Sequence, residues 1–209
     1  MTGETTPMVA LSAADQTMAG LIARIGPMSV DRRRRGRPKG DAYGTLLRAV
    51  VGQQLSVKAA ATIFDRVLAL FGGKMPTAEQ LLKADVQALR GAGLSGRKVE
   101  YLKDLAIHVL DGELEIDRLG ELPDEEVIAQ LVAVRGLGIW TAHMFLIFHL
   151  EREDVLPVGD LGIRNAIKTE YGMAELPTPS EMEAMAEAWR PHRTLACLYL
   201  WESYSSSPG

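Results

Sequence analysis

Apolar residues recur along this chain at the three- and four-residue spacing of an α-helix. In residues 43–71 two such stripes lie on either side of a short polar stretch. Their members are Leu46, Leu47, Val50 and Val51, then Ala60, Ile63, Val67 and Leu70. No segment alternates convincingly in the way a half-buried strand does. The pattern therefore predicts an all-α protein of roughly ten helices.

Polar residues at the ends of the apolar runs indicate where helices begin. Ser56 is a good N-cap for the helix that follows it. Thr77 with Gln80 three residues later predicts a capping box, at the start of a helix that ends near residue 90. Ser180 is the predicted N-cap of a helix running to residue 189. Near the N-terminus we expect a loose tail over residues 1–12 and one short helix over residues 13–25.

Two glycines separate two apolar helical runs in the middle of the chain. Residues 127–134 form the first run, Gly136 and Gly138 follow in the string RGLG, and residues 139–150 form the second run. Glycine allows a positive φ and puts no Cβ in the way of an approaching group. The next helix presents backbone N–H groups and the positive end of its dipole, a combination that binds phosphate. The alternative is an ordinary tight turn with glycine at a helix C-cap.

Composition sets limits on the class of protein. The chain has 209 residues, 47% of them hydrophobic, which suits one large domain or two small packed lobes. No apolar run is long enough to span a bilayer, and the N-terminus does not resemble a secretory signal. The single cysteine, Cys197, excludes both a disulfide framework and a four-cysteine iron–sulfur cluster. We expect a cytoplasmic protein, associated with the nucleoid if it is bacterial.

A net charge of −4 counts mildly against a nucleic-acid partner, although the local charge matters more than the total. Residues 31–40 are the exception, because six of these ten are basic, from Arg32 to Lys39. The alternatives are a solvated loop, a segment that contacts phosphate, and an arginine-glycine segment that enters a narrow minor groove.

Several strings in one order carry a family resemblance. GQQLS at residues 52–56, RGAGLSGRK at 90–98, VRGLGIWTA at 134–142 and PVGDLGIR at 157–164 resemble the helix-hairpin-helix (HhH-GPD) DNA glycosylases. Within them the chain is most similar to the alkylbase branch, 3-methyladenine DNA glycosylase II. The resemblance covers residues 43–201 and implies two helical lobes with the active-site cleft between them. It implies three parts: residues 1–40 packing with the C-terminal lobe, residues 41–150 with the wedge loop and hairpin, and residues 151–209 with the catalytic aspartate.

The resemblance places the family's catalytic aspartate at Asp160. Its ordinary role would be the N-cap of the helix it begins, and one residue can serve both purposes. Trp140 and Trp201 match aromatic positions of the base pocket, and Trp189 and Tyr199 are weaker candidates. Core packing is the alternative for each of them.

The remaining site residues also follow from the resemblance. Either Gln54 or Leu55 would enter the duplex and fill the gap left by an extruded base. The alternative for the two glutamines, Gln53 and Gln54, is that they are polar turn residues. Gly136, Gly138 and Thr141 would contact phosphate, and the alternative for Thr141 is a helix cap. A structural Na⁺ or K⁺ is expected on backbone carbonyls of the hairpin, those of Val132, Val134 and Gly136.

The reaction implied is hydrolysis of the N-glycosidic bond of an alkylated base, such as 3-methyladenine or 7-methylguanine, flipped out of double-stranded DNA. Relatives that also cut the strand carry a lysine where this chain has Trp140, so we expect a monofunctional enzyme. We expect a monomeric protein that requires no cofactor and holds no iron–sulfur cluster.

Three alternatives remain open at this point. The first is a non-catalytic helix-hairpin-helix DNA-binding module, which would need neither Asp160 nor the aromatic residues. The second is a glycosylase for another damaged base. The third is a helical scaffold for a partner protein, which leaves the GQQLS, RGLGIWTA and VGDLGIR strings unexplained.

Overall fold

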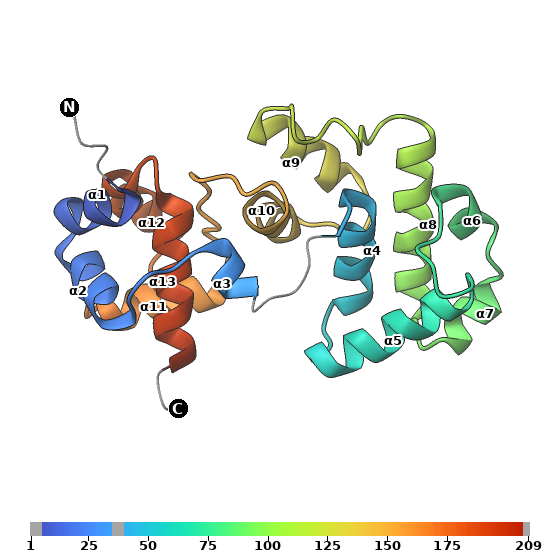
Figure 1. Ribbon diagram of the computed structural model, residues 1–209, viewed down its shortest axis with the longest axis horizontal. Helices are drawn as coiled ribbons and strands as arrows, with labels where there is room; N and C mark the ends of the chain where they lie inside the picture. Colours follow the sequence, from blue (N-terminus) through green and yellow to red (C-terminus); the bar gives the residue numbers. More distant parts are fainter. Residues whose placement is uncertain (1–5, 35–39, 207–209) are drawn as a thin grey trace. The chain divides into compact units, whose positions relative to one another are not determined.

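The computed structural model describes residues 6–34 and 40–206, and every element in these ranges is a helix (Figure 1). The all-α prediction is therefore confirmed. The described residues form two compact units. The terminal unit takes residues 6–34 and 146–206, and the middle unit takes residues 40–145.

The terminal unit is built around its last helix. Its elements are α1 (Pro7–Ala14), α2 (Gln16–Ile25), α3 (Val30–Arg34), α11 (Leu161–Glu170), α12 (Pro179–Ala186), the 3₁₀ helix η1 (Glu187–Trp189) and α13 (Arg193–Ser206). Helix α13 packs against α1, α2 and α11. Trp189 and Tyr199 are fully buried in this core. The Trp189 indole and the Tyr171 hydroxyl both donate to the Asp15 carboxylate, at 2.9 and 2.7 Å.

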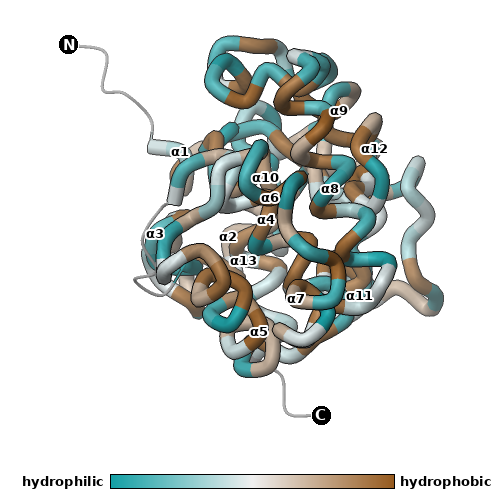
Figure 2. The backbone as a smooth tube through the Cα atoms, turned by 90° about the vertical axis from the view of Figure 1, so that its right-hand side faces the viewer, coloured by the Kyte–Doolittle hydropathy of each residue, from teal (hydrophilic) through white to brown (hydrophobic). Residues whose placement is uncertain are grey.

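The middle unit is built around its longest helix. Its elements are α4 (Ala42–Gly52), α5 (Val57–Ala69), α6 (Ala78–Lys83), α7 (Val86–Gly91), α8 (Gly96–Leu110), α9 (Asp124–Ala133) and most of α10 (Ile139–Phe148). Helix α8 packs against α4, α6 and α7, and α4 packs against α5. Hydrophobic and hydrophilic stretches alternate along the helices (Figure 2), as burial of one face requires.

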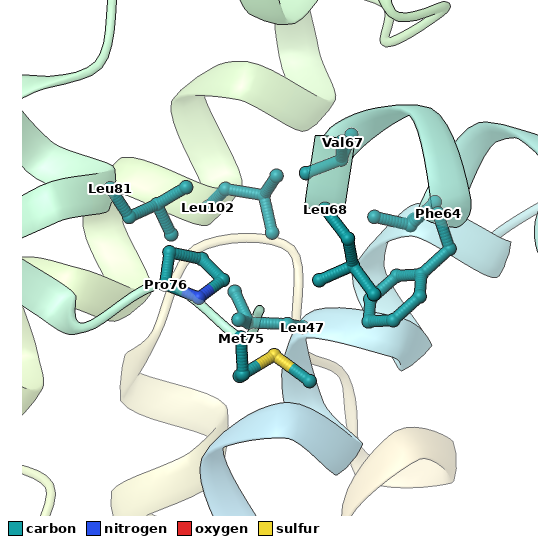
Figure 3. Close-up of a pocket in the computed structure, with 9 residues that line it drawn as sticks. Leu47, Phe64, Val67, Leu68, Met75, Pro76, Leu81 and Leu102 are labelled. Carbon is teal, nitrogen blue, oxygen red and sulfur yellow. The ribbon is translucent and has the colours of Figure 1, made fainter. Parts of the chain in front are cut away.

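A small cavity lies inside the middle unit, and apolar side chains line it throughout. Leu47, Phe64, Val67, Met75 and Leu102 are among its walls (Figure 3). A cavity without polar groups cannot orient a polar ligand, since binding sites place a few polar groups among apolar ones. We read it as a packing gap of the core.

Several helix ends differ from the prediction. Residues 7–14 form α1 rather than a loose tail, with the Thr6 side chain accepting from the Val9 amide and a proline in the first turn. The expected single helix over residues 13–25 is interrupted at Asp15. Its backbone is extended and its carboxylate caps α2, accepting from the amides of Thr17 and Met18.

The predicted caps of Ser56 and Thr77 are confirmed, the latter in a full capping box with Gln80. The helix expected to run to about residue 90 is two helices, because Ala84 is extended and Asp85 caps α7. The cap predicted at Ser180 lies at Thr178 instead, with Pro179 in the first turn. Such extra breaks raise the count to thirteen α-helices among the described residues. None of the described helices is both long enough and apolar enough to cross a bilayer.

Candidate functional site

Asp160 lies at the end of the aspartate loop (residues 151–160), directly before α11. Its side chain is only 7% exposed. Oδ1 accepts the backbone N–H of Ile163 at 2.9 Å and the indole N–H of Trp201 at 2.9 Å. Asp160 is thus the N-cap of α11, and a second donor from another helix fixes its carboxylate.

Trp201 lies on α13 and is 8% exposed. Its ring stacks on Phe148, with centroids 5.7 Å apart and an interplanar angle of 29°. Gly162 makes room for the contact with Asp160, because a Cβ there would come 3.1 Å from Asp160 Oδ1 and 3.3 Å from Trp201 Cδ1. Phe148, Asp160 and Gly162, which this tryptophan contacts, all belong to its own unit.

Helix α13 also holds the beginning of the aspartate loop. The Thr194 hydroxyl accepts the Val155 amide at 3.1 Å and donates to the Arg152 carbonyl at 2.7 Å. Arg193 Nε lies 2.7 Å from Asp154 Oδ1. The same helix therefore fixes the loop at Val155 through Thr194 and at Asp160 through Trp201. Thr194 and Gly162 have no role that a local pattern predicts, because Thr194 contacts Val155 and Gly162 contacts Trp201, each far away in the chain.

The wedge loop (residues 53–56) joins α4 to α5 in the middle unit. Gln54 at its tip has a φ of 56°, in the left-handed region that residues with a Cβ rarely adopt. Gln54 is exposed, and the Leu55 side chain is 37% exposed. Both residues that were candidates for the wedge therefore reach solvent, and the geometry does not separate them.

The hairpin loop (residues 134–138) joins α9 to α10. Gly136 has a φ of 87°, and a Cβ there would lie 2.2 Å from Cδ2 of Tyr101, so glycine is required twice over. Gly138 has no positive φ and nothing within 4 Å of an added Cβ. The positive φ expected of a hairpin glycine is thus found at Gly136. Gly138 instead leaves open space beside the start of α10.

Thr141 and Trp140 lie in the first turn of α10. The Trp140 side chain is 50% exposed, so core packing does not account for it. The hairpin loop and Trp140 belong to the middle unit, and Asp160 with Trp201 belongs to the terminal unit.

A family model for the HhH-GPD superfamily, described as base excision DNA repair proteins, matches residues 47–191. This chain belongs to the HhH-GPD superfamily. The matched region contains the wedge loop, the hairpin loop and Asp160, which are the features that carry the resemblance. It ends before Trp201, so the partner of Asp160 lies beyond it.

Relatives of this HhH-GPD chain match it over nearly its whole length. DNA-3-methyladenine glycosylase 1 of Schizosaccharomyces pombe is 35% identical over 97% of this chain and 89% of its own. The crystal structure of a DNA-3-methyladenine glycosidase from Bacillus halodurans superimposes with a TM-score of 0.86 at 35% identity, over 99% of this chain and 92% of that one. The structure of a 3-methyladenine DNA glycosylase from S. pombe in complex with abasic DNA superimposes with a TM-score of 0.80 at 32% identity, over 96% of this chain and 97% of that one.

The described basic residues of the stretch beginning at Arg32 contact other residues of this HhH-GPD protein. Arg32 donates to the Pro27 carbonyl, Arg33 pairs with Glu202 at 3.0 Å, and Arg34 pairs with Glu151 at 3.1 Å. Residues 32–34 lie in α3 rather than in the solvated loop that was one of the alternatives, and Arg33 and Arg34 pair with carboxylates. Residues 35–39, including Arg37 and Lys39, lie outside the described residues.

Proposed function

We propose that this HhH-GPD protein is a monofunctional DNA glycosylase that acts, as a monomer, on double-stranded DNA containing alkylated bases. The observation that carries the proposal is the Asp160 carboxylate, which the Ile163 amide and the Trp201 indole hold in one orientation. The names of the relatives, DNA-3-methyladenine glycosylases, support the substrate class.

The chemistry needs one fixed carboxylate. Cleavage of the bond between C1′ and the base nitrogen builds positive charge on the deoxyribose. A carboxylate beside it stabilises that charge more in the transition state than in the neutral ground state. The same group can orient the attacking water or accept its proton. An N-alkylated purine already carries a positive charge, so it leaves without a strong general acid.

The other residues prepare the substrate. The hairpin loop with Gly136, Gly138 and Thr141 would hold a phosphate through backbone N–H groups and the positive end of α10. Gln54 or Leu55 would fill the gap left by the everted base. The exposed face of Trp140 suits stacking and cation–π attraction to a cationic base. Trp201 is mostly buried, so in our proposal it serves chiefly to hold Asp160.

The proposal includes a monovalent cation on the carbonyls of the hairpin loop, each of which must keep a free lone pair for it. The Val134 carbonyl accepts the Leu137 amide, and the Gly136 carbonyl accepts the Gln53 side chain. A carbonyl oxygen has two lone pairs, so each keeps capacity for an ion. With Val132, in the last turn of α9, they would hold Na⁺ or K⁺ and add positive potential beside the phosphate. Separately, in the described part of the chain no three His, Cys, Asp or Glu side chains are grouped to bind a metal.

The test is incubation of the purified protein with methylated duplex DNA, followed by identification of the released bases by mass spectrometry. The proposal expects free 3-methyladenine or 7-methylguanine, with the DNA strand left intact at the abasic site. Duplex binding without release of any base would favour a non-catalytic module. Release from oxidised or mismatched DNA only would assign a different substrate.

A further inference from the structure

One face of α8 contacts both the wedge loop and the hairpin loop of the middle unit. Lys98, Tyr101 and Asp104 follow one another at intervals of three, which places them along one side of a helix. The Asp104 carboxylate accepts the Arg135 amide at 2.7 Å, and the Tyr101 ring packs on Gly136. These two residues hold the hairpin loop.

Lys98 holds the wedge loop from the same face. Its Nζ donates to the carbonyls of Val51 and Gln53, each at 2.8 Å. The carbonyls at the end of a helix lack intrahelical partners, so the bond to Val51 by itself would be an ordinary cap of α4. The bond to Gln53 goes further, because Gln53 lies outside α4 and begins the wedge loop. Partial burial lowers the pKa of Lys98, which agrees with an ammonium group held against the carbonyls at the end of α4.

Gln53 joins the two loops directly. Its side-chain Nε2 donates to the Gly136 carbonyl at 2.7 Å, across 83 positions of sequence. The next residue, Gln54, holds a φ of 56°. A residue with a Cβ stays in that region only where its surroundings impose it, and Gln53 is fixed at both its carbonyl and its amide. The strained tip and the fixed residue before it point to a loop that is held in shape before DNA arrives.

We propose that Gln53 and Lys98 are positioning residues that lock the wedge loop to the hairpin loop, so that phosphate binding by one sets the depth at which the other enters the duplex. The inference rests on the proposed function. It assigns to the first glutamine of the GQQLS string a role distinct from that of Gln54. Base eversion then depends on Gln53 although Gln53 need not touch the everted nucleotide.

The test uses Gln53→Leu and Lys98→Met in the full chain, with Arg97→Met as the matched loss of one positive charge from the exposed neighbour on α8. The probe is a duplex with an abasic-site analogue beside 2-aminopurine, whose fluorescence rises when the local stack opens. Loss of one hydrogen bond in Gln53→Leu and of two in Lys98→Met predicts that the fluorescence rise and the single-turnover rate of base release fall at least about fivefold in each variant. Duplex affinity is expected to change by less than about threefold, since the phosphate contacts remain.

Two further variants separate positioning from simple stability. Lys98→Arg keeps donors for both carbonyls and is expected to restore most of the fluorescence rise. The double variant Gln53→Leu/Lys98→Met is expected to be no slower than the slower single one, because both substitutions break the same link. All measurements are made well below each variant's melting temperature.

Wild-type fluorescence and release rate in Gln53→Leu, or a Lys98→Met variant that only melts earlier, would overturn the proposal. An equal loss in Arg97→Met would overturn it too, since charge alone would then be responsible. If the wild-type protein releases no base from methylated DNA, the proposed function fails. The fluorescence of the abasic duplex still decides whether the two loops act together.

Discussion

The indole Nε1 of Trp201 lies 2.9 Å from Oδ1 of Asp160, the same oxygen that caps α11. One carboxylate oxygen therefore receives a donor from its own helix and another from α13. A cap needs only the first. The second bond ties the orientation of the carboxylate to a helix that also fixes the start of the aspartate loop through Thr194.

Replacing Trp201 by phenylalanine keeps a ring against Phe148 and removes the N–H donor. Because a hydrogen bond to a charged group contributes about 1.5–3 kcal/mol, we expect base release to slow by roughly ten- to a hundredfold with little change in duplex affinity. Trp189→Phe is the matched control, since it removes an indole N–H from Asp15 in the same unit. It should lower stability but leave the rate of the folded enzyme unchanged. Equal rates in the two variants would contradict the role of Trp201.

The two glycines of the hairpin loop should respond differently to substitution. Gly136→Ala forces a positive φ on alanine and places its Cβ 2.2 Å from Cδ2 of Tyr101, well inside van der Waals contact. We expect a loss of at least about 1 kcal/mol in the free energy of unfolding, measured by denaturant titration. Gly138→Ala meets open space and should fold like the wild type. A stable Gly136→Ala variant would mean that the loop takes another conformation.

Arg33 and Arg34 are predicted to contribute little to DNA binding. Both form ion pairs with acidic residues of their own unit. Each phosphate contact contributes about 0.9 to the slope of log affinity against log salt concentration, so the slope should not change in Arg33→Gln or Arg34→Gln. A slope that is smaller by about 0.9 in either variant would show that the arginine leaves its carboxylate to contact DNA.

The residue at position 140 predicts the outcome of borohydride treatment. A tryptophan has no amine with which to attack the sugar, so no Schiff base forms there. Sodium borohydride added during turnover should trap no covalent complex between protein and DNA, as judged by denaturing gel electrophoresis. A trapped complex would require an amine nucleophile elsewhere and would refute the monofunctional assignment.

Local patterns predicted much of the fold. Periodic apolar residues and caps such as Ser56 and Thr77 depend on neighbours three or four positions away, so they can be read from sequence. The break at Asp15 was missed because its carboxylate has three kinds of partner. Besides the amides of α2, it accepts from Tyr171 and Trp189, more than 150 positions away.

The candidate site shows the same division. Asp160 and Gly136 stand in strings that resemble a family, and the sequence singles them out. Lys98 and Gln53 stand in the RGAGLSGRK and GQQLS strings, but the strings give neither residue a role of its own. Their functions depend on contacts with Val51 and Gly136, which only folding brings together.

Asp160→Asn tests the central claim most directly. The asparagine side-chain oxygen can still accept from Ile163 and Trp201, so the loop should keep its shape while the negative charge is lost. The measurement is the single-turnover release of methylated base from duplex DNA, with affinity determined in parallel. The account predicts a rate reduced by at least about a hundredfold at nearly unchanged affinity. Release at the wild-type rate would contradict it.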